Sequence, residues 1–150
     1  MFRFCLAYMT VLCLISLFQG VATAITASPD PFGIYVGAVR GFFWEGAAVP
    51  AEAEALRRFL MGIIGGTLAG YFTFVLFLIV YPLRARERWA HTAIASGLLV
   101  WFCVDSAMSL YHGALFNLQI VNIPTMILWS IPLILTRRHT LNRSAREQNV

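Results

Sequence analysis

The chain has 150 residues, of which 59% are of hydrophobic type and only 12% are charged. Soluble chains are closer to half apolar and a quarter charged, so this composition indicates a membrane protein. The length leaves room for one domain, residues 1–150, and excludes a membrane bundle joined to a separate soluble enzyme. The formal net charge is +4, but the basic residues lie beside apolar segments and form no aromatic-interleaved patch. We therefore expect no nucleic-acid partner.

The first apolar stretch covers residues 4–24 and is long enough to cross a bilayer as a helix. A second interpretation is a signal peptide, because Ala22-Thr23-Ala24 has the form of a cleavage site. Cleavage there would leave three spans and a periplasmic N-terminus. The length of the apolar run favours an uncleaved helix.

Residues 27–57 form the longest loop and contain an amphipathic segment. Its apolar residues recur at helical spacing, at Phe32, Tyr35, Val36, Val39 and Phe43. Three interspersed glycines would weaken such a helix in water by about 1 kcal/mol each, so it needs a membrane surface or a neighbour. The pattern predicts a short periplasmic interfacial helix between the first and second spans.

The second apolar stretch covers residues 59–82 and follows Glu54 and Arg58, an i, i+4 ion pair. Gly62, Gly66 and Gly70 recur every four residues and make a flat face on which another helix can pack. That helix belongs either to the same chain or to a second copy in a homo-oligomer.

Two further apolar stretches, residues 89–112 and 115–136, follow in close succession. A segment inside a bilayer must satisfy its backbone hydrogen bonds internally, so each of the four stretches is predicted to be a helix. The expected fold is an all-α bundle of four transmembrane helices with a polar tail at residues 137–150.

The arginines predict the orientation of this bundle. Eight of the 11 basic residues lie before the first stretch, between the second and third, or after the fourth. The positive-inside rule places these segments, and both termini, in the cytoplasm.

Asp105 is the one acidic residue inside a predicted span. A carboxylate at mid-helix costs about 2.5–3.5 kcal/mol in insertion, so it should face protein or water and have a partner. A spacing of 100° per residue places Trp101, Ser109 and His112 on the same face. Other polar groups predicted at this level are Asn117, Gln119 and Asn122, with Arg40 as the basic side chain able to reach them. The sequence predicts a polar pocket in the periplasmic half.

Three uses of this pocket remain open. It could be a hydrogen-bond network that fixes helix packing, a binding site for a small polar or amphipathic molecule, or a step in proton-linked transport. Catalysis is not indicated, because Asp105, Ser109 and His112 lie along one helix without an oxyanion hole or a G-x-S-x-G motif. No cofactor or metal is expected, since no two histidines share a depth and no Cys/His ligand spacing occurs.

Residues 59–122 resemble small four-helix proteins of bacterial inner membranes. The residues that carry the resemblance are Gly62-x-x-Gly65-Gly66, Glu87-Arg88-Trp89-Ala90, Trp101-Phe102-x-x-Asp105-Ser106 and His112-Gly113-Ala114. The layout is also similar to DoxX-like membrane proteins, in architecture only. The resemblance implies no activity and no site residues.

The resulting functional hypothesis is a non-enzymatic, multi-pass inner-membrane protein that binds a small ligand or a partner protein through its periplasmic half. A proton-coupled transporter acting as an oligomer, and an accessory subunit of a membrane complex, are the alternatives. The expected partners are the lipid bilayer and either a second copy of the chain or another membrane protein.

Overall fold

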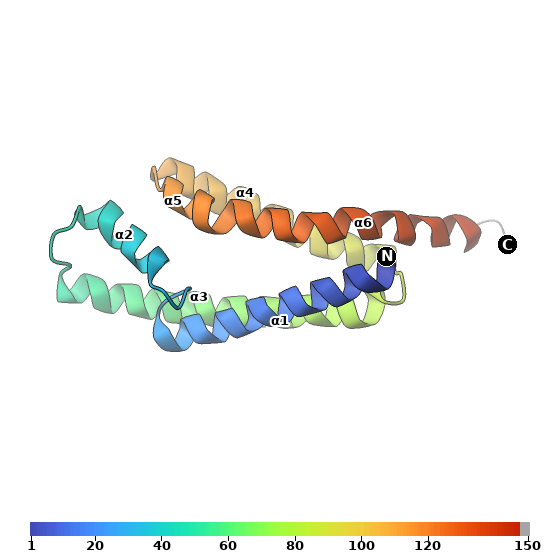
Figure 1. Ribbon diagram of the computed structural model, residues 1–150, viewed down its shortest axis with the longest axis horizontal. Coiled ribbons are helices and arrows are strands. Elements are labelled where there is room, and N and C mark those ends of the chain that lie inside the picture. The colour runs from blue at the N-terminus through green and yellow to red at the C-terminus, as the bar shows by residue number, and fades with distance from the viewer. Residues whose placement is uncertain (148–150) are drawn as a thin grey trace. The chain divides into compact units, whose positions relative to one another are not determined.

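The computed structural model describes the backbone of residues 1–147 and the side chains of residues 1–137. Within this part of the chain every regular element is helical, which confirms the all-α prediction. In chain order the elements are α1 (Phe2–Thr26), α2 (Ile34–Trp44), α3 (Ala51–Leu78), η1 (Ile79–Leu83), α4 (Arg88–Tyr111), α5 (Leu115–Asn117), η2 (Leu118–Asn122) and α6 (Ile123–Glu147) (Figure 1). The elements η1 and η2 are single π-helical turns.

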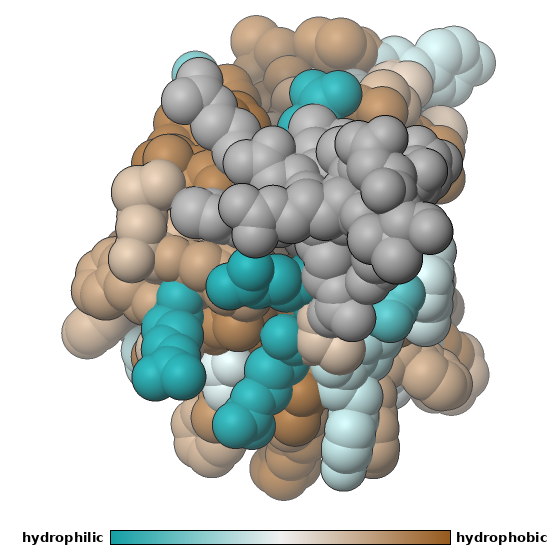
Figure 2. Space-filling model, turned by 90° about the vertical axis from the view of Figure 1, so that its right-hand side faces the viewer, coloured by the Kyte–Doolittle hydropathy of each residue, from teal (hydrophilic) through white to brown (hydrophobic). Residues whose placement is uncertain are grey.

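Four helical segments are long and apolar enough to cross a membrane, as predicted. They are Phe2–Thr26, Ala51–Leu83, Arg88–Tyr111 and Leu115–Arg137. Only 22–28% of the residues in their most apolar windows are buried within the chain, which leaves most of their apolar surface for lipid or other helices. Seen from the end where the chain starts, hydrophilic side chains lie among the apolar ones (Figure 2).

The chain divides into two compact units. Unit 1 contains Met1–Cys13 and the chain from Phe74 onward, and unit 2 contains Leu14–Thr73. Both α1 and α3 contribute residues to each unit, so the division falls inside helices rather than at a linker.

Unit 2 is held together by a close helix crossing between α1 and α3. A Cβ atom added at Gly20 would lie 2.9 Å from the Gly65 carbonyl oxygen, and one added at Gly65 would also lie within 3.0 Å of backbone atoms of α1. Two backbones can approach this closely only where neither residue carries a side chain. The crossing therefore depends on a glycine from each helix.

The segment predicted to be an interfacial helix is α2, and its first turn is capped by Asp30. The carboxylate accepts hydrogen bonds from the backbone nitrogens of Phe32 and Ile34 through Oδ1, and from that of Tyr35 through Oδ2. Partial burial acts to raise the pKa of this carboxyl, but the amide hydrogen bonds outweigh it and lower the pKa below its ordinary value. None of the residues of α2 is buried. Its placement at a membrane surface stays a prediction.

The core of unit 1 is formed by one face of each of four helical elements, α1, η1, α4 and α6. Buried residues recur on these faces every three or four positions. Cys5 and Met9 of α1, Ile79 and Leu83 of η1, and the α4 face are buried. The antiparallel partner of α4 is α6, which runs back along it (Figure 1) and contributes Trp129 and Leu133. The buried α4 residues are Ala90, Ile94, Leu98, Ser106 and Ser109.

One long-range hydrogen bond joins the two helices near the start of α4. The carbonyl oxygen of Leu133 in α6 is 2.8 Å from Nε2 of His91. A carbonyl only accepts, so Nε2 of His91 must carry the proton. The sequence analysis did not predict this contact.

The α1–α3 crossing yields a test with a matched control. Gly65→Ala should lower the melting temperature in detergent, because overpacking against backbone typically costs about 1–3 kcal/mol. Gly66→Ala makes the same chemical change one residue later, where no other atom lies within 4 Å, and should not lower it. Equal melting curves for the two variants would show that the crossing is not as close as described.

Candidate functional site: the polar seam of α4 and η2

The predicted acid Asp105 has a hydrogen-bonding partner across the turn that ends α4. Nδ2 of Asn117 lies 2.7 Å from Oδ2 of Asp105 and 2.8 Å from Oγ of Ser109. The Ser109 hydroxyl in turn donates to the Asp105 backbone carbonyl at 2.8 Å. The structure thus brings together three of the predicted site residues, from α4 and from α5.

A second contact joins α4 to η2, the element that follows α5. Asn122 is fully buried at the end of η2, and its Nδ2 donates to Oγ of Ser106 at 3.0 Å. The other amide atom, Oδ1 of Asn122, is buried with no hydrogen-bond partner in the described structure. Reversing the amide would leave its nitrogen unpaired instead, so one strong polar group is unsatisfied in either orientation.

We call the five residues Asp105, Ser106, Ser109, Asn117 and Asn122 the polar seam. A π-helical turn explains why both asparagines reach α4. In an α-helix, residues five apart point about 140° away from each other. In η2 the backbone nitrogen of Ile123 bonds to the carbonyl of Leu118, an i→i+5 pattern that brings residues five apart to nearly the same side.

Sequence reasoning missed Ser106. It lies three residues before Ser109 and therefore on the same helical face, so its position was available from spacing alone. The turn that carries Asn117 back to α4 includes Gly113, whose φ of 71° lies in the left-handed region.

Two other residues predicted for the site, one in α4 and one at its C-terminal cap, lie outside these contacts. Trp101 is half-buried one turn before Asp105. His112 is exposed, and its ring packs edge-on against Tyr111 with centroids 5.0 Å apart. Within the described residues no hydrogen bond or ion pair joins His112 to Asp105, and no cation pairs with the Asp105 carboxylate.

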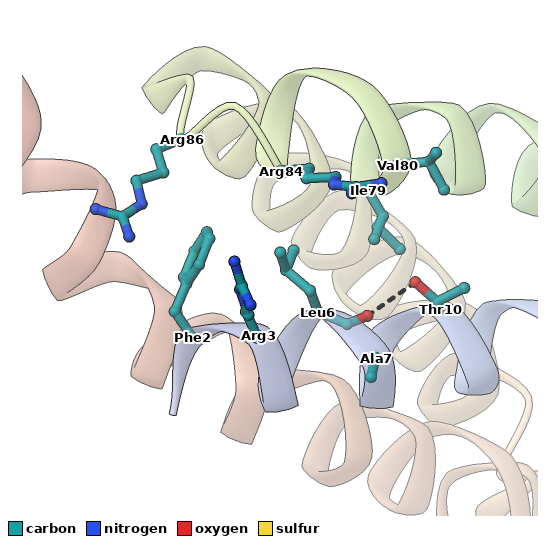
Figure 3. A pocket seen from close by; sticks show the side chains of 9 residues that line it. All are labelled: Phe2, Arg3, Leu6, Ala7, Thr10, Ile79, Val80, Arg84 and Arg86. Atoms are coloured by element: carbon teal, nitrogen blue, oxygen red, sulfur yellow. Dashed lines mark hydrogen bonds between the residues drawn. The ribbon is translucent and has the colours of Figure 1, made fainter.

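The structure has a cavity of about 670 Å³ elsewhere in unit 1. It lies between the start of α1 and η1 with the turn that follows η1, and Arg3, Arg84 and Arg86 are among its lining residues (Figure 3). None of the predicted site residues lines it. The polar seam is a set of contacts on facing helices rather than part of this cavity.

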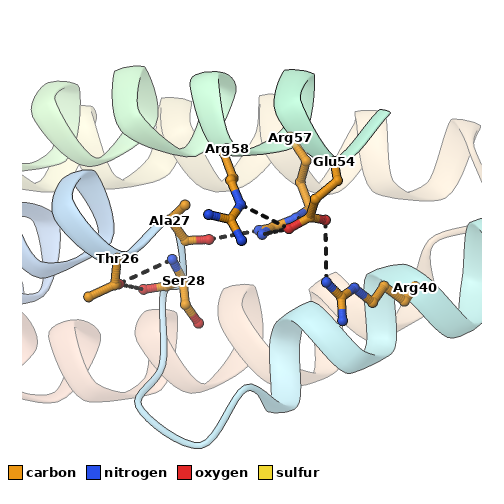
Figure 4. A network of polar contacts seen from close by, with 7 residues as sticks. All are labelled: Thr26, Ala27, Ser28, Arg40, Glu54, Arg57 and Arg58. Atoms are coloured by element: carbon orange, nitrogen blue, oxygen red, sulfur yellow. Dashed lines mark hydrogen bonds and ion pairs between the residues drawn. The ribbon is translucent and has the colours of Figure 1, made fainter. Parts of the chain in front are cut away.

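The predicted basic partner Arg40 belongs to unit 2 and forms an ion pair there. Its guanidinium is 3.3 Å from Oε2 of Glu54, and Oε1 of the same carboxylate lies 2.8 Å from Arg57 and 3.2 Å from Arg58 (Figure 4). Arg57 donates a further hydrogen bond to the carbonyl of Ala27 and so ties α3 to the end of α1. The predicted Glu54–Arg58 pair is confirmed. A contact between Arg40 and the polar seam stays a prediction.

The predicted glycine face of α3 has two different parts. A Cβ atom at Gly62 would make ordinary contact, at 3.9 Å, with the Ala24 carbonyl oxygen, whereas Gly66 and Gly70 have nothing within 4 Å. The close intrachain approach uses Gly65, which lies between Gly62 and Gly66. Gly66 and Gly70 therefore remain open for a helix from outside the chain.

Comparison with known proteins adds no relative: no family model, no curated protein and no solved structure matches the chain.

The contacts of Asn117 lead to a prediction about stability. Asn117→Leu should reduce the free energy of unfolding in detergent by about 0.6–2 kcal/mol, the range for interhelical polar bonds, because Asp105 and Ser109 lose their shared donor. Gln119→Leu makes the same kind of change on an exposed side chain of η2 and should have little effect. A larger loss in the Gln119 variant would contradict the importance of the seam.

Proposed function

We propose that the chain is a non-enzymatic, multi-pass protein of a bacterial inner membrane that binds a small ligand or a partner protein at the polar seam. The observation that carries the proposal is the unsatisfied amide atom of buried Asn122. An unpaired polar group in a protein interior costs about 1–3 kcal/mol, and a ligand that supplies the missing hydrogen bond would recover that energy.

The Asp105 carboxylate supports the same function. It lies within a span and is half-buried, and its described side-chain partner is a neutral amide. Intramembrane acids usually face a partner or a water-filled path. The carboxylate favours a ligand that donates hydrogen bonds, such as an amine or a polyol.

The orientation of the seam follows from the charge pattern of the sequence. The arginine-rich 84–88 turn starts α4, and the seam lies near the other end of α4. With the arginines in the cytoplasm and both termini there, the seam belongs to the periplasmic half.

The test is native mass spectrometry of the full chain extracted gently from its own membrane. The wild type should carry a small-molecule or protein adduct. Asp105→Asn and Asn122→Leu should lose it while keeping their helical circular dichroism, because both remove groups that would face the ligand. Gln119→Leu should keep the adduct.

A wild-type chain that carries nothing would contradict binding at the seam. Lower thermal stability of Asp105→Asn in that case would assign the seam to helix packing. The intact mass from the same experiment also shows whether the first 24 residues remain.

A second candidate, a proton-coupled transporter working as an oligomer, is favoured by the open glycines of α3. Gly66 and Gly70 leave a flat helix surface with no atom of the described chain against it. Asp105, with no cationic partner among the described residues, would be the proton carrier.

The oligomer can be tested by crosslinking in native membranes. Gly66→Leu should abolish a crosslinked dimer or larger species, since the added side chain blocks close approach of a second helix. It should leave the monomer folded, because the position is open within the chain. An unchanged crosslinking pattern would exclude this face as the oligomer interface.

A further inference from the structure

The cavity of unit 1 combines cationic and apolar surfaces. Arg3 and Leu6 extend from α1 toward the helix that carries Ile79 and Arg84 (Figure 3). Val80 and, in the next turn, Arg86 also line it. The cavity thus has three guanidinium groups beside aliphatic side chains.

The charge of this cavity is not balanced by the side chains of residues 1–137. Guanidinium groups stay protonated at all physiological pH values, so the three arginines contribute three positive charges. None of the lining residues is acidic, and no described carboxylate forms an ion pair with Arg3, Arg84 or Arg86. The described partner of Arg86 is the Phe2 ring, 5.1 Å away, a cation–π contact that leaves its charge uncompensated.

The backbone of η1 places Arg84 in the cavity. The nitrogen of Arg84 bonds to the carbonyl of Ile79, five residues earlier, at 3.2 Å. This π-turn brings Arg84 to the side of the helix that Ile79 occupies, whereas a continuous α-helix would turn it about 140° away. Pro82 lies inside the turn and has no N–H to lose, which lowers the cost of leaving the α-helical pattern.

We propose that this cavity binds an anionic phospholipid, with its phosphate at the three arginines and the first part of an acyl chain along Leu6, Ile79 and Val80. Arginine forks bind phosphate oxygens in pairs, and basic pockets between membrane helices take anionic headgroups. A free phosphate would satisfy the charge but leave the aliphatic surface uncovered, so a lipid fits better. The cavity also lies at the arginine-rich end of the bundle, where the chain is predicted to meet the lipid headgroups.

This inference is independent of the polar seam. Seventeen residues of α4 separate Arg88 from Asp105, a helical rise of about 25 Å. Variants of one site should leave the other intact.

The test uses the full chain in nanodiscs of phosphatidylcholine containing a minor fraction of phosphatidylglycerol, with bound lipid measured by native mass spectrometry. The wild type should retain phosphatidylglycerol selectively. The double variant Arg84→Gln/Arg86→Gln should lower its apparent affinity about 25-fold, since each basic residue near a headgroup contributes about a fivefold factor. Arg84→Lys should give an intermediate loss, because a lysine keeps the charge but not the paired hydrogen bonds.

Arg88→Gln is the matched control. It removes one positive charge from the same end of the bundle, on a residue that does not line the cavity, and is compared per charge with the double variant. An equal loss of phosphatidylglycerol in this variant would show that general surface charge, and not the cavity, attracts the lipid. Equal retention of both lipids by the wild type would overturn the proposal.

Competition distinguishes the lipid from a free anion. Inorganic phosphate at millimolar concentration should leave the bound phosphatidylglycerol in place, because it cannot cover the aliphatic wall. Displacement by phosphate alone would instead identify an anion site. Circular dichroism of each variant checks that its helices are retained, so that loss of lipid is not loss of fold.

Discussion

The lack of hydrogen-bonding partners in hydrocarbon is the constraint on which the rest of this structure depends. Every polar side chain within a span must find a partner in the protein. Most hydroxyl groups here do so locally, by donating to the carbonyl four residues earlier, as at Thr10, Thr23, Thr67, Thr73 and Thr136. Such groups use their single donor within their own helix.

The polar seam is different because its amide and carboxylate groups cannot be satisfied within one helix. A primary amide has two donors and two acceptor sites, and a carboxylate accepts several hydrogen bonds. Asn117 links Asp105 with Ser109, but Asn122 keeps one buried atom unpaired. A network meant only to hold helices together would gain stability from completing that bond. Its incompleteness is the physical reason for preferring a binding role.

Much of this could be predicted from the sequence. Length and hydropathy are strong signals for spans, because one segment must cross the whole hydrocarbon core. The short connection between the third and fourth spans correctly placed Asn117 at the level of Asp105, although the hydrogen bond between them was not predicted. Helical spacing correctly predicted the Glu54–Arg58 pair. These features depend on local distances along a regular helix, which a sequence shows directly.

The glycine contact was harder to predict, because several candidates share the same helix. Gly62, Gly66 and Gly70 have the familiar four-residue spacing, yet the close approach uses Gly65 and Gly20. Which glycine meets a partner depends on the rotation of both helices about their axes. That rotation is set by the packing of all their side chains, including those of a helix distant in sequence.

The π-turns connect the two proposed sites. Each precedes or contains a proline, Pro124 after η2 and Pro82 within η1, where one α-helical hydrogen bond is already missing. The extra residue rotates the later side chains by about 100° about the helix axis. It brings Asn122 to the side of Asn117 at the seam, and Arg84 to the side of Ile79 at the cavity. A regular spacing of 100° per residue separates both pairs. One backbone irregularity on each flank of α4 thus produces a site where a regular helix would have divided its groups.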